Sequence, residues 1–206
     1  MQRRPIIALA ALSPLASLLL PANAQAATFG QAAPDFTLMD TAGQPVKLSQ
    51  FKGKPVVLEW NNPGCPFVKK HYRGNMQALQ KEVAAQGAVW LAINSTRDDS
   101  ADHLAPDQLG RWMIEQKASP TATLMDEDGK VGQAYAARVT PHMYIVSAQG
   151  VLVYVGAIDS IASARVEDIP KATNYVRQAM AEIKAGKPVS VATSRAYGCS
   201  IKYSSA

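Results

Sequence analysis

The sequence predicts an α/β fold in which a central mixed sheet is flanked by helices on both faces. Two continuous apolar runs, Pro55 to Trp60 and Val89 to Asn94, have the length of buried parallel strands. Between them, apolar residues recur every three or four positions, which is the period of one helical face. A third observation is the pair of apolar runs on either side of Ser147-Ala148-Gln149-Gly150, which is typical of a β-hairpin.

Two short extended segments, Ala33 to Leu38 and Gln44 to Leu48, are expected around the turn Asp40-Thr41-Ala42-Gly43. The buried strand that ends at Trp60 should lead into a helix that begins at Pro66, because proline suits the first helical position. The inward face of this helix is formed by residues spaced three or four apart: Val68, Tyr72, Met76, Leu79 and Val83.

The second half of the chain adds three helices and the hairpin. We expect helices at about Pro106 to Lys117, around Val131 to Ala137 and at about Ile169 to Lys184. The hairpin strands are Met143 to Val146 and Val151 to Val155. The first of the three helices should bury Leu109, Trp112 and Met113.

The N-terminus has the pattern of a secretory signal peptide. Two arginines precede an apolar stretch from Ile6 to Leu20, and two overlapping A-x-A cleavage patterns follow within Ala22 to Ala26. An uncleaved membrane anchor is the alternative. However, the stretch contains Pro14 and is shorter than the ~20 apolar residues that span a bilayer. We therefore expect residues 1–26 to be removed on export, with a bacterial periplasm as a suitable destination.

The remaining chain, 27–206, is expected to form a single domain that ends in a polar tail, 187–206. The full chain has 206 residues and is 48% apolar, which is enough for a sizeable core. Its formal net charge of +5 falls by two, to +3, when the arginines of the signal peptide leave. That charge is too small to indicate a nucleic-acid partner, and no stable membrane anchor is expected after cleavage.

The two cysteines, Cys65 and Cys199, carry the most informative chemistry. Cys65 is placed where a strand ends and a helix begins, so the unpaired amides and the positive end of the helix dipole favour its thiolate. Export would place both cysteines in an oxidising environment, where a disulfide between them is chemically permitted. Such a disulfide could be purely structural or part of a reaction.

The chain resembles the thioredoxin-like superfamily, and within it the peroxiredoxin-like branch of redoxin or AhpC/TSA type, from about Ala33 to Lys184. Trp60-Asn61-Asn62-Pro63-Gly64-Cys65-Pro66-Phe67-Val68-Lys69 stands where thioredoxins carry a tryptophan-led C-x-x-C followed by lysine. Thr140-Pro141-His142 precedes the hairpin, where that fold has a cis-proline. Glu59 matches the buried acid with which thioredoxins move a proton.

The resemblance implies a thioredoxin-like fold but does not settle the chemistry. Thiol chemistry suggests the roles: Cys65 would attack a disulfide or hydroperoxide as a thiolate, and Cys199 would resolve the resulting mixed disulfide or sulfenic acid. Glu59 would be a proton carrier. Glu59 has two alternatives, pairing with a lysine or facing a wet sheet edge. The backbone edge before Pro141 would pair with an incoming substrate chain. The residues implied in substrate binding are Trp60, Pro66, Phe67, Lys69, Thr140 and Pro141.

Two departures from these families shape the functional hypotheses. Val68 replaces the second cysteine of C-x-x-C, which makes exchange within that motif impossible. Asn62 stands three residues before Cys65, where peroxiredoxins carry threonine. The leading hypothesis is therefore an exported thiol-disulfide oxidoreductase of redox homeostasis that needs an unidentified electron donor and no cofactor. A thiol-dependent peroxidase that reduces hydroperoxides is the close alternative.

A third hypothesis is a protein without catalysis, in which the cysteines form a structural disulfide or join His71 and His142 in binding a metal. The C-x-x-x-C spacing of exported copper chaperones is missing, because Lys69 occupies the second cysteine's place. Lone histidines are also more often packed or solvated than metal ligands. We expect no metal site.

Overall fold

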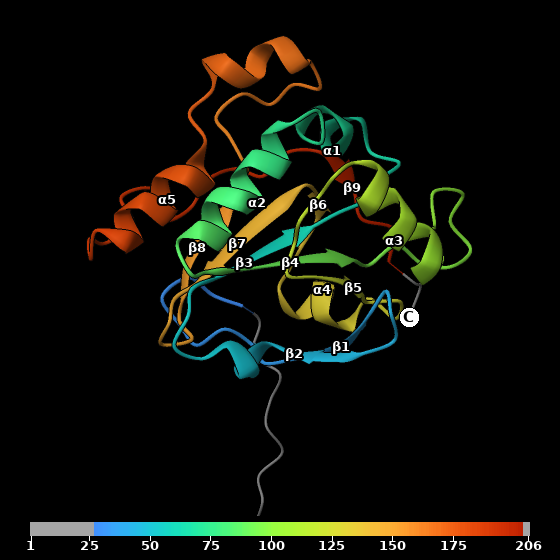
Figure 1. The fold of residues 1–206 in the computed structure, drawn as a ribbon, viewed down its shortest axis with the longest axis horizontal. Coiled ribbons are helices and arrows are strands. Elements are labelled where there is room, and N and C mark those ends of the chain that lie inside the picture. Colours follow the sequence, from blue (N-terminus) through green and yellow to red (C-terminus); the bar gives the residue numbers. More distant parts are fainter. Residues whose placement is uncertain (1–26, 204–206) are drawn as a thin grey trace, which may run out of the picture.

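The computed structural model describes residues 27–203, so the expected signal peptide, 1–26, lies outside the described residues. The described chain is built on a mixed seven-stranded sheet with the order β2-β1-β5-β4-β3-β7-β8 (Figure 1). Strands β3, β4 and β5 are mutually parallel, and the remaining pairs in this sheet are antiparallel. A separate pair, β6 and β9, joins the middle of the chain to its C-terminal tail.

The strands of the main sheet are β1 Thr37–Asp40, β2 Pro45–Lys47, β3 Val56–Trp60, β4 Val89–Asn94, β5 Ala122–Met125, β7 His142–Val146 and β8 Leu152–Gly156. The separate pair is β6 Val139–Thr140 and β9 Cys199–Ser200. The α-helices are α1 Pro66–His71, α2 Asn75–Ala85, α3 Pro106–Glu115, α4 Lys130–Ala134 and α5 Tyr175–Lys184. Two 3₁₀ helices span Leu48–Phe51 and Val166–Lys171. None of the described helices is long and apolar enough to cross a membrane.

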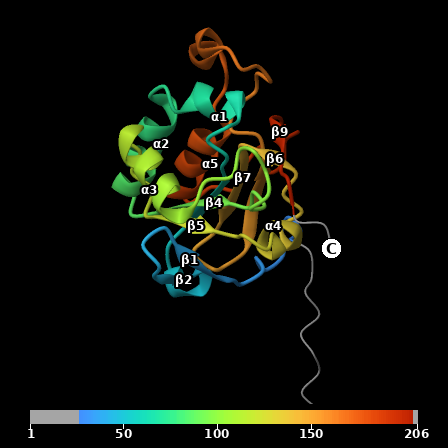
Figure 2. The same ribbon diagram turned by 90° about the vertical axis from the view of Figure 1, so that its right-hand side faces the viewer.

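Helices cover both faces of the sheet, which confirms the predicted α/β architecture. Helices α1, α2, α3 and α5 lie on one face and α4 lies on the other (Figures 1 and 2). Each central strand contributes to two cores, because successive side chains of a strand point to opposite faces. In β3, Val57 joins the core under the four helices, whereas Leu58 and Trp60 join the core on the α4 side.

The helix predicted to start at Pro66 is interrupted. Helix α1 ends at His71, and α2 begins at Asn75 after Gly74, which has a φ of 112°. The predicted apolar face is nevertheless correct, because all five of its residues are buried: Val68, Tyr72, Met76, Leu79 and Val83. The interruption therefore changes the direction of the helix without removing its contact with the sheet.

Other differences from the sequence prediction are local. Strand β5 was not predicted, because only four residues separate the bend at Thr121 from the turn at Asp126. The predicted helix Ile169 to Lys184 is divided in two. Its start belongs to a 3₁₀ helix that contains Pro170, and the rest is α5, whose first turn is capped by the Asn174 side chain. Trp112 was expected in the core. It is only partly buried, and its ring lies 4.6 Å from that of Tyr72.

Replacement of Gly74 by alanine tests the interruption. We expect Gly74→Ala to lower the free energy of unfolding by about 1–3 kcal/mol, because an L side chain is strained at this positive φ. Gly110→Ala, inside α3, is the matched control. It should raise the free energy of unfolding by up to about 1 kcal/mol. Equal stability of both variants in urea unfolding would contradict this account of the α1–α2 junction.

Candidate active site

Cys65 lies at the start of α1, just beyond the carboxyl end of the central strand β3. It is the N-cap residue and has an extended backbone, with a φ of −76° and a ψ of 124°. Pro66 occupies the first helical position, as expected. The Cys65 carbonyl accepts the first helical hydrogen bond, from the amide of Lys69, at 2.9 Å. The cysteine is only 1% exposed, so any reaction at its sulfur depends on what covers it.

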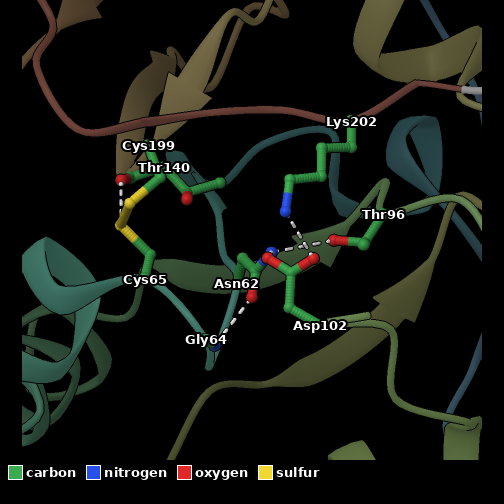
Figure 3. Close-up of a disulfide and its surroundings, with 8 residues drawn as sticks. All are labelled: Asn62, Gly64, Cys65, Thr96, Asp102, Thr140, Cys199 and Lys202. Carbon is green, nitrogen blue, oxygen red and sulfur yellow. Dashed lines mark hydrogen bonds and ion pairs between the residues drawn. A yellow bond between two sulfur atoms is a disulfide. The ribbon is translucent and has the colours of Figure 1, made fainter. Parts of the chain in front are cut away.

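The covering group is the C-terminal tail, through a disulfide between Cys65 and Cys199 (Figure 3). The two residues are 134 positions apart in the sequence and their Cα atoms are 5.8 Å apart. Strand β9 places Cys199 directly opposite Thr140 in β6. The sulfur of Cys65 lies 3.1 Å from the Thr140 carbonyl oxygen, an acceptor for the thiol once the disulfide is reduced. The proximity of Cys65 and Cys199 is thus confirmed.

The Thr140-Pro141 peptide bond is cis, as the resemblance implied. Both residues are buried. The Thr140 hydroxyl oxygen is also buried and has no hydrogen-bond partner within residues 27–203. The backbone beside the disulfide is therefore fixed by pairing with the tail and not by the Thr140 side chain.

Asn62 fixes the loop that leads to Cys65. Its side-chain oxygen accepts the Gly64 amide at 2.7 Å, and its nitrogen donates to Asp102 at 2.8 Å (Figure 3). The same Asp102 carboxylate pairs with Lys202 of the tail at 2.9 Å, and hydrogen bonds from Lys202, Ser100 and Asn62 lower its pKa to about 2. Asn62, which stands where peroxiredoxins carry threonine, therefore holds the loop in place and, through Asp102, links it to the tail.

Glu59 is fully buried on the same face of the sheet as α1. Its carboxylate accepts hydrogen bonds from Asn61 at 2.8 Å, Tyr72 at 2.9 Å and the Trp90 indole at 2.8 Å. Burial raises the pKa of the Glu59 carboxyl. The carboxylate has neither a lysine partner among the described residues nor a wet edge, so the two alternative interpretations of Glu59 are wrong. A buried acid with a raised pKa can exchange a proton near neutral pH.

The residues expected to bind substrate are placed differently from one another. Trp60 is fully buried on the α4 side, where its indole donates to Ser95 at 3.0 Å, so it presents no surface. Pro66 and Lys69 are exposed, and Lys69 forms no ion pair within residues 27–203. Phe67 is partly buried, and its ring lies 5.7 Å from that of Tyr197 in the tail. Of this group, Pro66, Phe67 and Lys69 offer surface next to Cys65.

The sequence did not predict the polar cluster that is formed by Lys70, His71, Asp159 and Tyr197, and it offered His71 only as a metal ligand. Lys70 is buried and pairs with Asp159 at 3.4 Å. Tyr197 donates to Asp159, and His71 lies 3.3 Å from the Tyr197 hydroxyl. By its charge, the run Lys69-Lys70-His71 suggests a solvated helix face. The only sequence signal for burial of Lys70 and His71 is that they directly follow Val68, on a short helix that packs on the core.

His71 and His142 do not form a common metal site. His71 belongs to α1, whereas His142 lies on the α4 side of the sheet, where its ring is 4.6 Å from that of Tyr144. Cys65 and Cys199 are joined to each other. Among residues 27–203, no group of three or more histidine, cysteine, aspartate or glutamate side chains converges in a way that could hold a metal ion.

The sequence profile of the AhpC/TSA family matches residues 29–155. The chain belongs to the AhpC/TSA family. This finding confirms the peroxiredoxin-like resemblance, and the matched segment contains Cys65 and Glu59 but ends before Cys199.

Curated relatives of the chain include both redox classes. Chloroplastic peroxiredoxin Q from Triticum aestivum is 35% identical over 106 residues, which cover 50% of this chain and 43% of the relative. The thiol-disulfide oxidoreductase ResA from Bacillus subtilis is 28% identical over 126 residues, which cover 61% of this chain and 65% of the relative. The match thus spans less than half of the peroxiredoxin Q chain.

Two solved structures resemble nearly the whole chain. An uncharacterized conserved protein from Geobacillus kaustophilus has a TM-score of 0.75 and 27% identity, with coverage of 87% of this chain and 94% of its own. A hypothetical protein from Sinorhizobium meliloti has a TM-score of 0.76 and 26% identity, with coverage of 88% and 98%. The thioredoxin domain of a Bacteroides vulgatus thiol-disulfide oxidoreductase, at 20% identity and a TM-score of 0.52, supports the thioredoxin-like fold alone.

The burial of His142 can be tested by the pH dependence of the free energy of unfolding. Burial lowers the pKa of His142 from 6.5 to about 4, so between these values the unfolded chain binds a proton that the folded chain does not. Stability should therefore be full above pH 6.5 and should fall as the pH drops toward 4. In urea unfolding, His142→Asn should reduce this fall by up to about 3 kcal/mol. His71, whose pKa burial also lowers to about 4, accounts for a further part of the fall. A fall in His142→Asn as large as that of the wild-type protein would exclude His142 as a cause.

Proposed function

We propose that this protein is an exported thiol-disulfide oxidoreductase in which Cys65 is the nucleophile and Cys199 the resolving cysteine. The observation that carries the proposal is the disulfide between the cysteine at the start of α1 and the cysteine of the tail. Membership of the AhpC/TSA family and the similarity to a thiol-disulfide oxidoreductase support it. Export is inferred from the N-terminal pattern of a charged start, an apolar stretch and A-x-A.

In the first step, the Cys65 thiolate attacks one sulfur of a substrate disulfide. A bond forms between Cys65 and that sulfur, the substrate S–S bond breaks, and the other substrate sulfur leaves as a thiolate. The position of Cys65 at the start of α1 favours its thiolate form. The Thr140 carbonyl oxygen, 3.1 Å from the Cys65 sulfur, can accept a hydrogen bond from the protonated thiol, which attacks only after it has lost that proton.

In the second step, the Cys199 thiolate attacks the sulfur of Cys65. The Cys65–Cys199 disulfide forms, the remaining substrate thiolate leaves, and two electrons have passed from the protein dithiol to the substrate. A dithiol donor must then restore both cysteines. This partner has no recognisable signature in the chain.

Glu59 is proposed as the group that exchanges a proton with the reacting thiols. Its raised pKa, caused by burial, places the carboxyl closer to neutral pH than an exposed glutamate. The neutral donors around it, Asn61, Tyr72 and Trp90, hold the carboxylate without neutralising its charge. Pro66, Phe67 and Lys69 are proposed as the surface that a substrate contacts beside Cys65, and Thr140 and Pro141 as the backbone opposite it.

A thiol-dependent peroxidase is the second candidate, favoured by the similarity to peroxiredoxin Q. In that reaction Cys65 would take one oxygen from a hydroperoxide and release an alcohol, and Cys199 would displace water from the resulting sulfenic acid. Asn62 counts against this candidate. Asparagine carries no hydroxyl to orient a peroxide at the threonine position, and the Asn62 amide is already hydrogen-bonded to Gly64 and Asp102.

The two cysteines can be tested by redox titration. In a series of glutathione buffers, the folded protein should interconvert between the disulfide and the dithiol, as followed by thiol alkylation and mass measurement. Cys65→Ser should abolish reduction of a substrate disulfide. Cys199→Ser should retain the first attack and accumulate a mixed disulfide on Cys65. A bridge that resists millimolar reductant while the protein stays folded would exclude the redox cycle.

Hydrogen peroxide distinguishes the two candidate reactions. An oxidoreductase acting on disulfides should react with peroxide at the rate of an ordinary thiolate, whereas a peroxidase should consume it far faster and lose this activity in Cys65→Ser. Rapid peroxide consumption by the reduced wild-type protein, with sulfenic acid detected in Cys199→Ser, would replace the first candidate by the second.

Glu59 has its own prediction. We expect Glu59→Gln to lower the turnover number for disulfide reduction about 100-fold, because proton exchange at the site is lost while the shape of the side chain is kept. The pH dependence of the wild-type turnover that is due to this carboxyl should disappear in the variant. Near-UV circular dichroism serves as the control for folding. A folded variant with wild-type turnover at every pH would exclude Glu59 from the reaction.

A further inference from the structure

The C-terminal tail forms the strand that pairs with β6 next to Cys65. The register is antiparallel, with Thr140 opposite Cys199 and Val139 opposite Ser200. Unpaired strand edges accept extended polypeptides through backbone hydrogen bonds. Here the edge that borders the proposed nucleophile is already paired with the chain's own residues, and Figure 3 shows the tail running past Thr140 and Cys199.

Gly198 makes this pairing unusually close. Its φ is 144°, a conformation that L side chains rarely adopt, and a Cβ atom at this position would collide with the carbonyl group of Thr140. Only glycine allows the tail backbone to approach β6 as it does. The residue before Cys199 is therefore fitted to the groove beside Cys65.

A first anchor holds the tail on the α1 side of the disulfide. Tyr197 donates a hydrogen bond to the buried carboxylate of Asp159. Burial lowers the pKa of His71 to about 4, so its ring is neutral at pH 7; it accepts from Asn75 at 2.8 Å through Nδ1 and can donate to Tyr197 through Nε2. The Tyr197 ring also packs on Phe67. None of these contacts involves either sulfur.

A second anchor holds the tail after Cys199. Lys202 pairs with Asp102 at 2.9 Å, and its carbonyl accepts the Arg97 amide at 3.0 Å. The Ile201 amide donates to the Arg138 carbonyl at 3.0 Å. The Tyr203 hydroxyl donates to the Ala137 carbonyl at 2.7 Å. The tail is thus fixed on both sides of Cys199 by contacts in which neither sulfur takes part, so cleavage of the S–S bond breaks none of them directly.

We propose that the docked tail, residues 197–203, closes the Cys65 site to extended polypeptides and makes low-molecular-weight disulfides the substrate class of this protein. An extended protein substrate would have to occupy the positions of Gly198, Cys199 and Ser200 to pair with β6. A small disulfide needs no such pairing. It needs only the Cys65 sulfur to be uncovered locally, which becomes possible when reduction breaks the S–S bond and the two sulfurs move apart. A cavity of about 630 Å³ lies beside the tail, and its lining includes Val139 and Gly198, the neighbours of Thr140 and Cys199 in the chain.

The inference rests on the proposed function and adds the identity of its substrate class. With a small disulfide R–S–S–R, the Cys65 thiolate forms a Cys65–S–S–R bond and one R–S⁻ leaves. Cys199, still docked, attacks Cys65 and the second R–S⁻ leaves, so the protein dithiol supplies both electrons. Because the anchors hold Cys199 against Cys65, the second step is intramolecular and has a high effective concentration.

The test compares two probes, cystine and insulin, on the fully reduced protein. Stopped and alkylated samples give the rate at which the Cys65 thiol disappears. The wild-type protein should react with cystine at least 100-fold faster than with insulin. Gly198→Ala should raise the insulin rate at least tenfold, because the Cβ pushes the tail away from β6. Gly186→Ala is the matched control, since this glycine also has a positive φ but open space around it, and it should leave both rates unchanged.

The two anchors provide independent variants in case Gly198→Ala does not fold. Tyr197→Phe combined with Lys202→Met should also raise the insulin rate, at least threefold. The control is Lys184→Met, because Lys184 forms no ion pair with residues 197–203 and does not line the cavity, and it should leave both rates unchanged. Ala162→Trp narrows the cavity beside the tail and should slow cystine about tenfold without changing the insulin rate.

Hydrogen exchange tests the docking directly. The Ile201 amide should keep its protection within tenfold when the disulfide is reduced, because its acceptor is the Arg138 carbonyl. Full loss of protection in the reduced form, or equal reactivity of the wild-type protein with insulin and cystine, would overturn the inference while leaving the redox cycle intact. Lack of reaction with both probes in a protein that folds would instead refute the proposed function, and the inference with it.

Discussion

Antiparallel pairing between Thr140 and Cys199 is the contact on which the site depends. It brings a residue of the C-terminal tail to the end of the central strand β3, where Cys65 begins α1. Disulfide formation requires Cα atoms within about 7 Å of each other. With Cys199 held against Thr140, its Cα atom lies 5.8 Å from that of Cys65, within this limit.

The polar residues around this pairing show how the fold stabilises buried carboxylates next to the two cysteines. Burial of Glu59 or Asp159 is unfavourable unless each carboxylate receives hydrogen bonds or an opposite charge. Glu59 receives three neutral donors, and Asp159 receives Lys70 and Tyr197. Burial raises the pKa of the Glu59 carboxyl, and the three donors oppose this rise. The contacts of Asp159 attach the tail to the helix that begins at Cys65.

The family relationship and the tail divide the site into two parts. The segment that matches the AhpC/TSA family supplies Cys65, Glu59 and the Thr140-Pro141 loop. The parts that lie beyond residue 155 supply Cys199, Tyr197 and the anchoring Asp159. In the proposed reaction, Cys199 of the C-terminal tail takes the role of the missing second cysteine of C-x-x-C, to which it is suited by its disulfide with Cys65.

The sequence alone determined the strand-helix-strand order, the buried faces and the position of Cys65, because these depend on local periodicity and on residues a few positions apart. It also indicated the cis-proline and the buried Glu59 through motif resemblance. Tertiary structure decided the break at Gly74 and strand β5. It also decided the cluster of Lys70, His71, Asp159 and Tyr197. Contacts such as His71 with Tyr197 join residues 126 positions apart, and no local pattern records which distant partner neutralises or buries a polar side chain.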